Sequence, residues 1–284
     1  MAATAMKPAK SMVTVRTAMT RRTRLDSELI RRGLARSRQQ AAELIEARRV
    51  TVSGQTAVKP STQVGVGEPI VVIGPGDQTA YVSRGGHKLA GALAAFPGLA
   101  VAGRYCLDAG ASTGGFTDVL LRAGASHVVA ADVGHGQLAW ALRTDPRVTV
   151  VDRVNIRYLS PERLSAAPDL ITADLSFISL SQVLPALVSV AAPDADFLLM
   201  VKPQFEVGRG RVGPGGVVRD PGLRAGAVAA VAAAAAELGL GVRGVTASPL
   251  PGPAGNAEYF LWLASGAPPL AESDLARAIA EGPR

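Results

Sequence analysis

The chain has 284 residues, 48% of them hydrophobic, and a formal net charge of +7. This length is enough for one or two domains with a sizeable core. No segment reaches the ~20 apolar residues that a membrane-spanning helix needs, and the single cysteine excludes an internal disulfide framework. We expect Cys106, in a strand-like run, to be a core residue of a cytoplasmic protein. The three histidines lack zinc-ligand spacing, so no metal site is expected.

Positive charge is concentrated near the N-terminus. Residues 1–60 contain 13 Lys and Arg and 4 Asp and Glu, a net of +9, so the other residues carry a net of −2. A basic region on a near-neutral body is typical of proteins that bind a polyanion, because each neutralised phosphate releases condensed counterions. The alternative is a solvated tail without a partner.

The first part of that region is expected to be a disordered basic tail, residues 1–23. It lacks the apolar segment of a secretory signal, although an Arg-rich stretch of this kind can mimic a transit peptide. A disordered tail, or a start assigned too early with Met19 opening the folded part, is a simpler hypothesis than a transit peptide.

Residues 24–78 are expected to form a small α+β domain. One apolar stripe begins at Leu25 and its helix ends at Gly33, while Ser37 is a natural N-cap for a second helix. Short alternating runs at 50–52 and 64–72 indicate strands, and the Gly/Pro-rich residues 74–77 indicate a linker.

Residues 79–284 alternate between strand and helix patterns. Strands are expected at 105–108, 127–132, 148–151, 170–174, 197–201, 242–247 and 258–263, and helices at 116–122 and 223–238 among others. This order predicts an α/β, Rossmann-like domain with a mostly parallel seven-stranded sheet covered on both faces. Ligands bind beyond the carboxyl ends of the strands in such sheets.

A glycine-rich loop follows the first of these strands. Its spacing differs from the G-x-G-x-x-G of dinucleotide sites, and Asp108 ahead of the glycines suits an ammonium group better than a phosphate. Asp132 ends the next strand, where a carboxylate can bind ribose hydroxyls, and the adenine is expected near residues 152–155. These features favour an S-adenosylmethionine site over a plain tight turn. The expected cofactor-binding residues are Asp108, Gly110, Ala111, Ser112, Gly114, Gly115, Phe116, Asp132 and Asn155.

Two polar residues follow buried strand runs at the same expected edge of the sheet. Asp174 ends the fourth strand and Lys202 the fifth. Their position favours a role in chemistry, although each alone could be a solvated strand end.

With these motifs the sequence resembles the TlyA family, whose members are described both as hemolysins and as ribosomal RNA 2′-O-methyltransferases. The resemblance runs from about Arg24 to the end and rests on SRGGHKL (83–89), GASTGGFT (110–117), DLSFIS (174–179), KPQFE (202–206) and PGGVV (214–218). It implies an FtsJ-like fold, transfer of a methyl group from S-adenosylmethionine to ribosomal RNA, with cytidine as the target, and a Lys-Asp-Lys-Glu quartet. The quartet falls on Lys88, Asp174, Lys202 and Glu258.

The quartet suits the reaction. A ribose hydroxyl is a poor nucleophile until its proton begins to leave, and a neutral lysine can accept that proton. We expect Lys202 to accept it and Lys88 to steer the hydroxyl, with the acids orienting the lysines. The linker at 79–82 departs from relatives that carry a more basic, Trp-containing segment, so coupling between the domains can differ here.

The region from Arg24 to Val72 is similar to S4-type RNA-binding domains. The candidate phosphate contacts are Arg24, Arg36, Arg38, Arg48, Arg49 and Lys59. Residues 1–60 contain no aromatic residue, so recognition of RNA shape is favoured over base stacking. The partner would be ribosomal RNA, free or in a ribosomal subunit, and the protein a monomer.

The sequence alone leaves other functional classes open. A membrane-lytic protein would need a spanning, exported or strongly amphipathic segment, and none is found in the sequence. A non-catalytic RNA-binding protein or a pseudouridine synthase could carry the same basic domain, and only cofactor binding would separate them from a methyltransferase. A nicotinamide dehydrogenase is opposed by the loop spacing.

Overall fold

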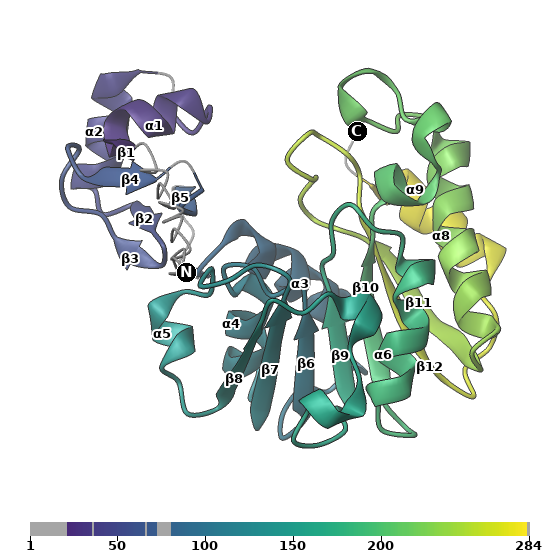
Figure 1. Cartoon of the computed structure of the whole chain (residues 1–284). Helices are drawn as coiled ribbons and strands as arrows, with labels where there is room; N and C mark the ends of the chain where they lie inside the picture. The colour runs from purple at the N-terminus through teal and green to yellow at the C-terminus, as the bar shows by residue number, and fades with distance from the viewer. Residues whose placement is uncertain (1–21, 36, 66, 73–80, 283–284) are drawn as a thin grey trace, which may run out of the picture.

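The computed structural model describes residues 22–35, 37–65, 67–72 and 81–282. A small N-terminal domain lies beside a larger α/β domain (Figure 1). The expected tail up to residue 21, Arg36, and the expected domain boundary at 78/79 lie outside the described residues.

The N-terminal domain packs two helices against short strands. The helices are α1 (Leu25–Arg31) and α2 (Arg38–Glu46), and the strands are β1 (Arg22–Arg24), β2 (Val50–Val52), β3 (Gln55–Thr56), β4 (Gln63–Gly65) and β5 (Ile70–Val72). The Ser37 hydroxyl accepts a hydrogen bond from the Gln40 N–H at 3.1 Å, so the expected N-cap is confirmed. Leu25, Leu29 and Ile45 are fully buried in its core.

One boundary of this domain differs from the expectation. Residues 22 and 23, assigned to the tail, belong to β1, which pairs antiparallel with β4. The strand is only three residues long, and its burial alternates in a pattern too short to recognise in the sequence. Pairing with a strand some 40 residues later orders it.

The larger domain is built on the expected seven-stranded sheet, in the order β11-β12-β10-β9-β6-β7-β8. The strands are β6 (Tyr105–Ala109), β7 (His127–Asp132), β8 (Val148–Asp152), β9 (Leu170–Ala173), β10 (Asp196–Val201), β11 (Leu240–Ala247) and β12 (Tyr259–Ser265). Pairs among β8, β7, β6, β9 and β10 are parallel, whereas β12 runs antiparallel to both of its neighbours. The strand predictions are confirmed to within two residues at each end.

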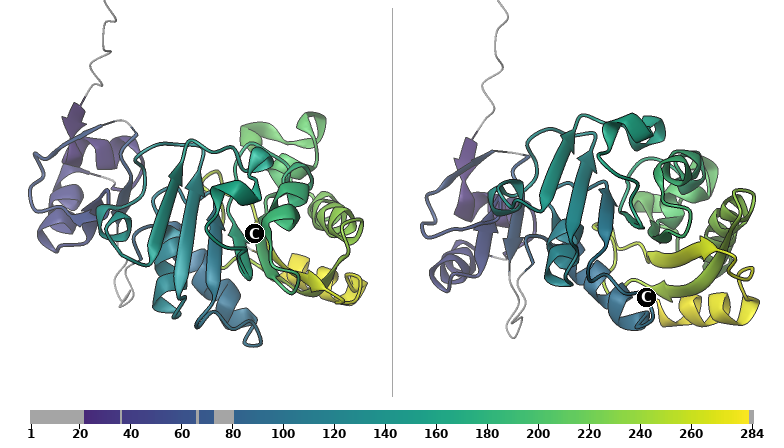
Figure 2. Two further views of the ribbon diagram at one scale, coloured as in Figure 1. Left: turned by 60° about the horizontal axis from the view of Figure 1, so that its bottom comes forward. Right: turned by 90° about the horizontal axis from the view of Figure 1, so that it is seen from below.

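Helices cover both faces of this sheet (Figure 2). They are α3 (Arg84–Ala95), α4 (Gly115–Arg122), α5 (Trp140–Arg143), α6 (Leu184–Val190), α7 (Pro203–Glu206), α8 (Pro221–Ala236) and α9 (Glu272–Glu281). Buried residues of α3 and α4 share one core cluster, and buried residues of α6 and α8 share the other. Cys106 is buried in the first cluster, as expected.

The topology brings the candidate residues to one edge of the sheet. The parallel strands β6, β7, β9 and β10 all end there. Because β12 is antiparallel, it begins there, so Glu258, just before β12, lies near Lys202, just after β10: their neighbours Tyr259 and Val201 are register partners. Among the described helices, none is long and apolar enough to span a bilayer.

Candidate active site

The loop between β6 and α4 is held tightly by its neighbours. Gly110 and Gly114 adopt positive φ angles of +89° and +97°, which glycine tolerates without strain. A Cβ on Gly110 would lie 2.6 Å from the carbonyl oxygen of Asp174, and one on Gly115 would lie 2.3 Å from the Ser83 hydroxyl. These glycines therefore let the loop lie directly against the end of β9 and the start of α3.

Asp132 ties the loop to the end of β7. Its carboxylate accepts the N–H of Ser112 at 2.8 Å and the N–H of Gly134 at 2.6 Å. Beside it is a cavity of about 500 Å³, and Asn155 and the apolar Ile156 line the same cavity. The cavity thus combines a carboxylate, an amide and apolar walls, a set that can hold a nucleoside.

Two of the expected cofactor residues lie behind the loop. Asp108 is fully buried and accepts a hydrogen bond from the Thr117 hydroxyl at 2.6 Å, while a Cβ on Gly114 would meet Leu142 at 2.2 Å. Neither residue lines the cavities on the other side of the loop. Direct contact of Asp108 with an ammonium group stays a prediction that this geometry does not favour.

Burial also changes the acidity of Asp108. Desolvation, opposed by the Thr117 hydrogen bond and reinforced by the charge of Asp174, raises its pKa to about 7. Its Oδ1 atom is buried without a hydrogen-bond partner. Asp108 therefore carries a proton over much of the acidic range in the folded protein.

The four residues of the expected quartet converge as two ion pairs. Lys88 Nζ, on α3, lies 2.5 Å from Glu258 Oε2, and Lys202 Nζ lies 2.6 Å from Asp174 Oδ1. Lys202 also donates a hydrogen bond to the Ser176 hydroxyl at 3.0 Å. Both lysines and Glu258 are buried, whereas the side chain of Asp174 is 22% exposed.

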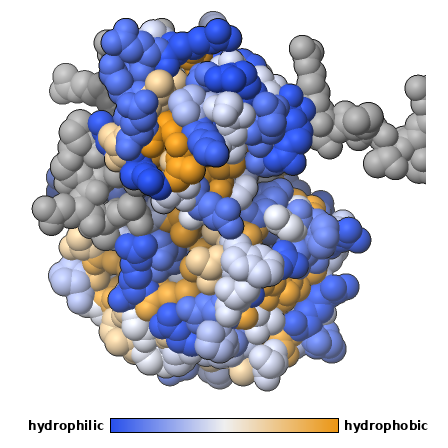
Figure 3. Space-filling view, turned by 90° about the vertical axis from the view of Figure 1, so that its left-hand side faces the viewer, coloured by the Kyte–Doolittle hydropathy of each residue, from blue (hydrophilic) through white to orange (hydrophobic). Residues whose placement is uncertain are grey.

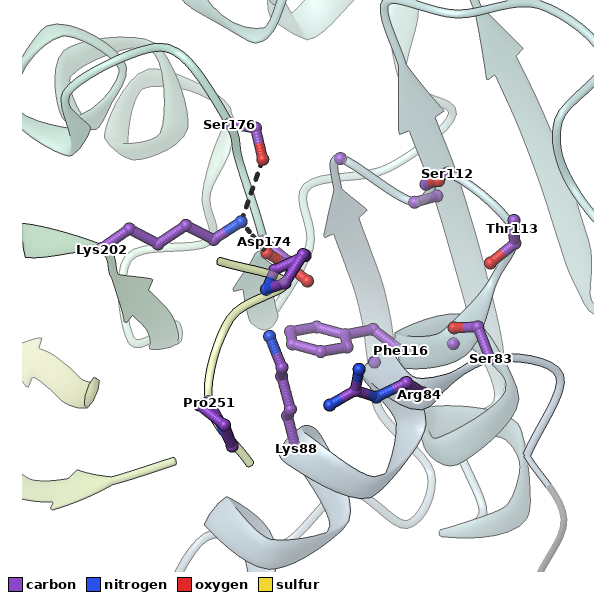
Figure 4. Close-up of a pocket in the computed structure, with 15 residues that line it drawn as sticks. Ser83, Arg84, Lys88, Ser112, Thr113, Phe116, Asp174, Ser176, Lys202 and Pro251 are labelled. Atoms are coloured by element: carbon purple, nitrogen blue, oxygen red, sulfur yellow. Dashed lines mark hydrogen bonds and ion pairs between the residues drawn. The ribbon is translucent and has the colours of Figure 1, made fainter. Parts of the chain in front are cut away.

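Lys88 of the first pair and both members of the second line another cavity, of about 280 Å³ (Figure 4). Its lining includes Lys88, Lys202 and Phe116, together with the glycine loop. Asp174 and Gly110 line both this cavity and the one beside Asp132. The two cavities therefore adjoin, and a ligand in one can meet a ligand in the other.

Three residues of the site were not assigned a role from the sequence. Ser176 bonds Lys202, Arg84 lines the smaller cavity, and Gln137 accepts a hydrogen bond from the Ser112 hydroxyl at 3.3 Å. Arg84 is four residues before Lys88, so it lies on the same face of a helix. That spacing indicates Arg84 only once the helix is known, and no helix was expected over these residues. The contacts of Ser176 and Gln137 arise from loops, where sequence spacing says little about position.

The N-terminal candidates differ in how available they are. Arg38, Arg48 and Lys59 are exposed, and no hydrogen bond or ion pair joins the side chain of Arg48 or Lys59 to a described residue. Arg24 instead forms an ion pair with Asp26 at 2.8 Å. Arg49 is partly buried, and Arg36 lies outside the described residues. Seen from the left-hand side of Figure 1, the N-terminal domain presents a mainly hydrophilic surface around a small apolar area (Figure 3).

Among the described residues, no group of three or more His, Cys, Asp or Glu side chains is placed to hold a metal ion.

Comparison with known proteins gives two family matches. Residues 81–265 match the FtsJ-like methyltransferase family, and residues 23–70 match the S4 domain. The chain is 62% identical to the 16S/23S rRNA (cytidine-2′-O)-methyltransferase TlyA of Mycobacterium tuberculosis, over 93% of this chain and 100% of that protein.

Other relatives carry hemolysin names. Hemolysin A of Brachyspira hyodysenteriae is 37% identical over 84% of this chain and 98% of its own length. A solved structure from Streptococcus thermophilus, also named as a hemolysin, is 36% identical and aligns with a TM-score of 0.76 over 92% of this chain and 96% of that one.

Proposed function

Since the chain belongs to the FtsJ-like methyltransferase family and also contains an S4 domain, we propose that it transfers a methyl group from S-adenosylmethionine to the 2′-hydroxyl of cytidine in ribosomal RNA. The observation that carries this proposal is the convergence of the Lys88–Glu258 and Lys202–Asp174 pairs on a cavity beside the glycine loop. The name of the 62% identical relative supports the choice of cytidine. We expect the protein to act as a monomer in the cytoplasm.

The residues of the larger cavity fit S-adenosylmethionine. Asp132 would accept hydrogen bonds from the ribose hydroxyls, and the adenine would lie between Asn155 and the apolar wall that includes Ile156. The backbone of Gly110 and Ser112 would contact the amino-acid part, because the loop faces both cavities. When bound, this cofactor supplies an electrophilic methyl group on a sulfonium sulfur.

The lysines would divide the work on the hydroxyl. Neutral Lys202 would accept the 2′-hydroxyl proton at Nζ, and Asp174 at 2.6 Å would hold the ammonium group that results. Ser176 fixes the direction of Lys202 through its hydrogen bond. Lys88, held by Glu258, would donate a hydrogen bond to the ribose oxygen and align it for attack.

The N-terminal domain would supply most of the affinity for RNA. Exposed Arg38, Arg48 and Lys59 can contact phosphates, which position a nucleic acid without reading its sequence. The residues after 60 have a net charge of only −2, so this role is left to the basic N-terminal region.

Transfer of labelled methyl groups tests the proposal. The purified protein is incubated with labelled S-adenosylmethionine and unmodified 16S or 23S ribosomal RNA, and the 2′-O-methyl positions are mapped. We expect Lys202→Ala to keep cofactor binding in calorimetry but to lower methyl transfer about 100- to 10,000-fold, the usual contribution of a general base.

A matched variant separates proton acceptance from charge. Lys202→Arg keeps a cation that can pair with Asp174, but a guanidinium does not give up its proton. It should be as inactive as Lys202→Ala. Methyl transfer by Lys202→Arg at the wild-type rate would remove Lys202 from its role, and the absence of 2′-O-methylated product with the wild-type protein would contradict the function itself.

A further inference from the structure

The smaller cavity carries one positive charge that the ion pairs do not use. Its charged lining residues are Arg84, Lys88, Asp174 and Lys202. Lys202 is paired with Asp174, and Lys88 is paired with Glu258. No described residue forms a hydrogen bond or ion pair with the exposed guanidinium of Arg84. Among the charged lining residues, Arg84 is thus the one that no described residue pairs with.

The place of Arg84 is fixed by α3. Arg84 and Lys88 are four residues apart on this helix, which puts their Cβ atoms about 5–6 Å apart on one face. Figure 4 shows both side chains reaching into the space beside the Phe116 ring. A group bound at Lys88 is therefore within reach of Arg84.

The chemistry of RNA supplies an anion at that place. The 2′-hydroxyl of a ribose is on the carbon next to the one that carries the 3′-phosphodiester, so the cavity cannot admit the hydroxyl without bringing this anion close. A planar guanidinium binds two phosphate oxygens at once, which fixes orientation as well as distance. On the basis of the proposed function, we propose that Arg84 binds the phosphodiester on the 3′ side of the target ribose and so positions the 2′-hydroxyl between Lys88 and Lys202.

The carboxylate of the cofactor is the other anion that could meet Arg84. Arg84 lines the smaller cavity beside the two lysines, but it does not line the cavity that contains Asp132 and Asn155. Because Lys88 and Lys202, which would hold the ribose, line the same cavity as Arg84, this placement favours the RNA phosphate. The two anions make different predictions, because loss of a carboxylate contact weakens cofactor binding, whereas loss of a phosphate contact weakens the use of RNA.

Steady-state kinetics and calorimetry on the full chain separate the two. Arg84→Ala should lower kcat/KM for ribosomal RNA about 10- to 100-fold, the range for one charge-assisted contact, and leave the Kd for S-adenosylmethionine unchanged. Arg84→Lys should fall between the wild type and Arg84→Ala, because a point charge replaces the fork. Arg163→Ala, which removes an exposed arginine outside the lining of both cavities, is the matched control and should behave as wild type.

A change in the RNA tests the contact directly. Once the methylated nucleotide is mapped, its 3′-phosphodiester is replaced by an uncharged methylphosphonate in a synthetic RNA fragment. Wild-type kcat/KM should fall by the same factor as in Arg84→Ala, and the modification should cause no further fall in Arg84→Ala, because the two changes remove one interaction.

Each contrary result has its own meaning. A raised Kd for S-adenosylmethionine in Arg84→Ala would assign the residue to the cofactor and overturn the proposal. Additive effects of Arg84→Ala and the methylphosphonate would also overturn it. Failure of the proposed function would look different, because the wild-type protein would then give no 2′-O-methylated product at all.

Discussion

The two domains use their charged side chains in opposite ways. In the catalytic cavity both members of the Lys88–Glu258 pair are buried, and Lys202 is buried against Asp174. In the N-terminal domain the Glu28–Arg31 pair buries only its acid. Glu28 is 1% exposed and is held by Arg31, whose side chain is 58% exposed.

The difference reflects what each domain must do. A buried lysine with one partner is fixed in place, as chemistry on a ribose oxygen requires. An arginine that pairs at one edge and faces water at the other keeps donors available for phosphate. The hydrogen bonds from Arg31 and then from Arg32 lower the pKa of Glu28 to about 2, so this anchor stays ionised at any ordinary pH.

The largest effect is expected where a buried pair is broken. Glu258→Ala leaves the Lys88 ammonium group buried without a partner, which should lower the free energy of unfolding by about 3–5 kcal/mol. The matched exposed pair is Asp274 with Arg277, whose side chains are 43% and 61% exposed. Asp274→Ala should lower the free energy of unfolding by about 0–1 kcal/mol. Denaturant unfolding of the two variants makes the comparison.

A double variant shows whether the loss comes from the unpaired charge. Lys88→Met/Glu258→Leu removes both charges and fills similar volume, so it should recover most of the stability while staying inactive. Equal destabilisation by Glu258→Ala and Asp274→Ala would end the contrast between buried and exposed pairs.

A smaller effect is expected at Asp108. Its pKa is raised from 3.8 to about 7 in the folded protein, chiefly by burial, so the folded state holds the proton more tightly than the unfolded state. The stability associated with this proton is fully present below pH 3.8 and is lost as the pH rises through about 7. Asp108→Asn cannot ionise, and above pH 7 it should be more stable than wild type by up to about 4 kcal/mol.

The pH dependence is the discriminating readout for this variant. The stability gain should be absent near pH 4, grow with pH, and level off above about pH 7 in thermal unfolding scans. Asp274→Asn, at an exposed position, should show no such trend. A gain that is the same at pH 4 and pH 8 would mean that packing, and not ionisation, is responsible.

Much of the larger domain could be predicted from the sequence because its strands are buried, apolar and separated by helices. The helix α3 could not, although it carries Lys88 and Arg84. Glycines at 85, 86 and 91 argue against a helix by propensity. In the structure, a Cβ on Gly86 would lie 2.4 Å from Tyr81 and one on Gly91 would lie 2.5 Å from Pro249. Tyr81 lies just before the helix and Pro249 lies far away in the chain. Packing against these two residues explains the glycines, and helix propensity does not reveal it.

The residues of the site also fall into two groups, those that could be inferred from the sequence pattern and those that could not. Asp174 and Lys202 follow apolar strands, so their edge of the sheet could be inferred from residues alone. Lys88 and Glu258 needed the family resemblance, because their positions depend on where α3 packs and on the antiparallel direction of β12. The interior position of Asp108, behind the loop, follows from its contact with Thr117 on α4, which no spacing rule identifies.

The smallest effects per residue are expected on the N-terminal surface. Arg38 and Lys59 are exposed, so each should add one phosphate contact, and removing both should lower the slope of log K against log salt concentration by about 1.4–1.8. Filter binding of ribosomal RNA across salt concentrations measures the slope for Arg38→Ala/Lys59→Ala, with Arg163→Ala as control. Stability should not change, because exposed side chains contribute little to it. An unchanged slope would show that these two exposed cations are not used for RNA. The N-terminal domain would then lack the available positive charge that distinguishes it from the catalytic domain.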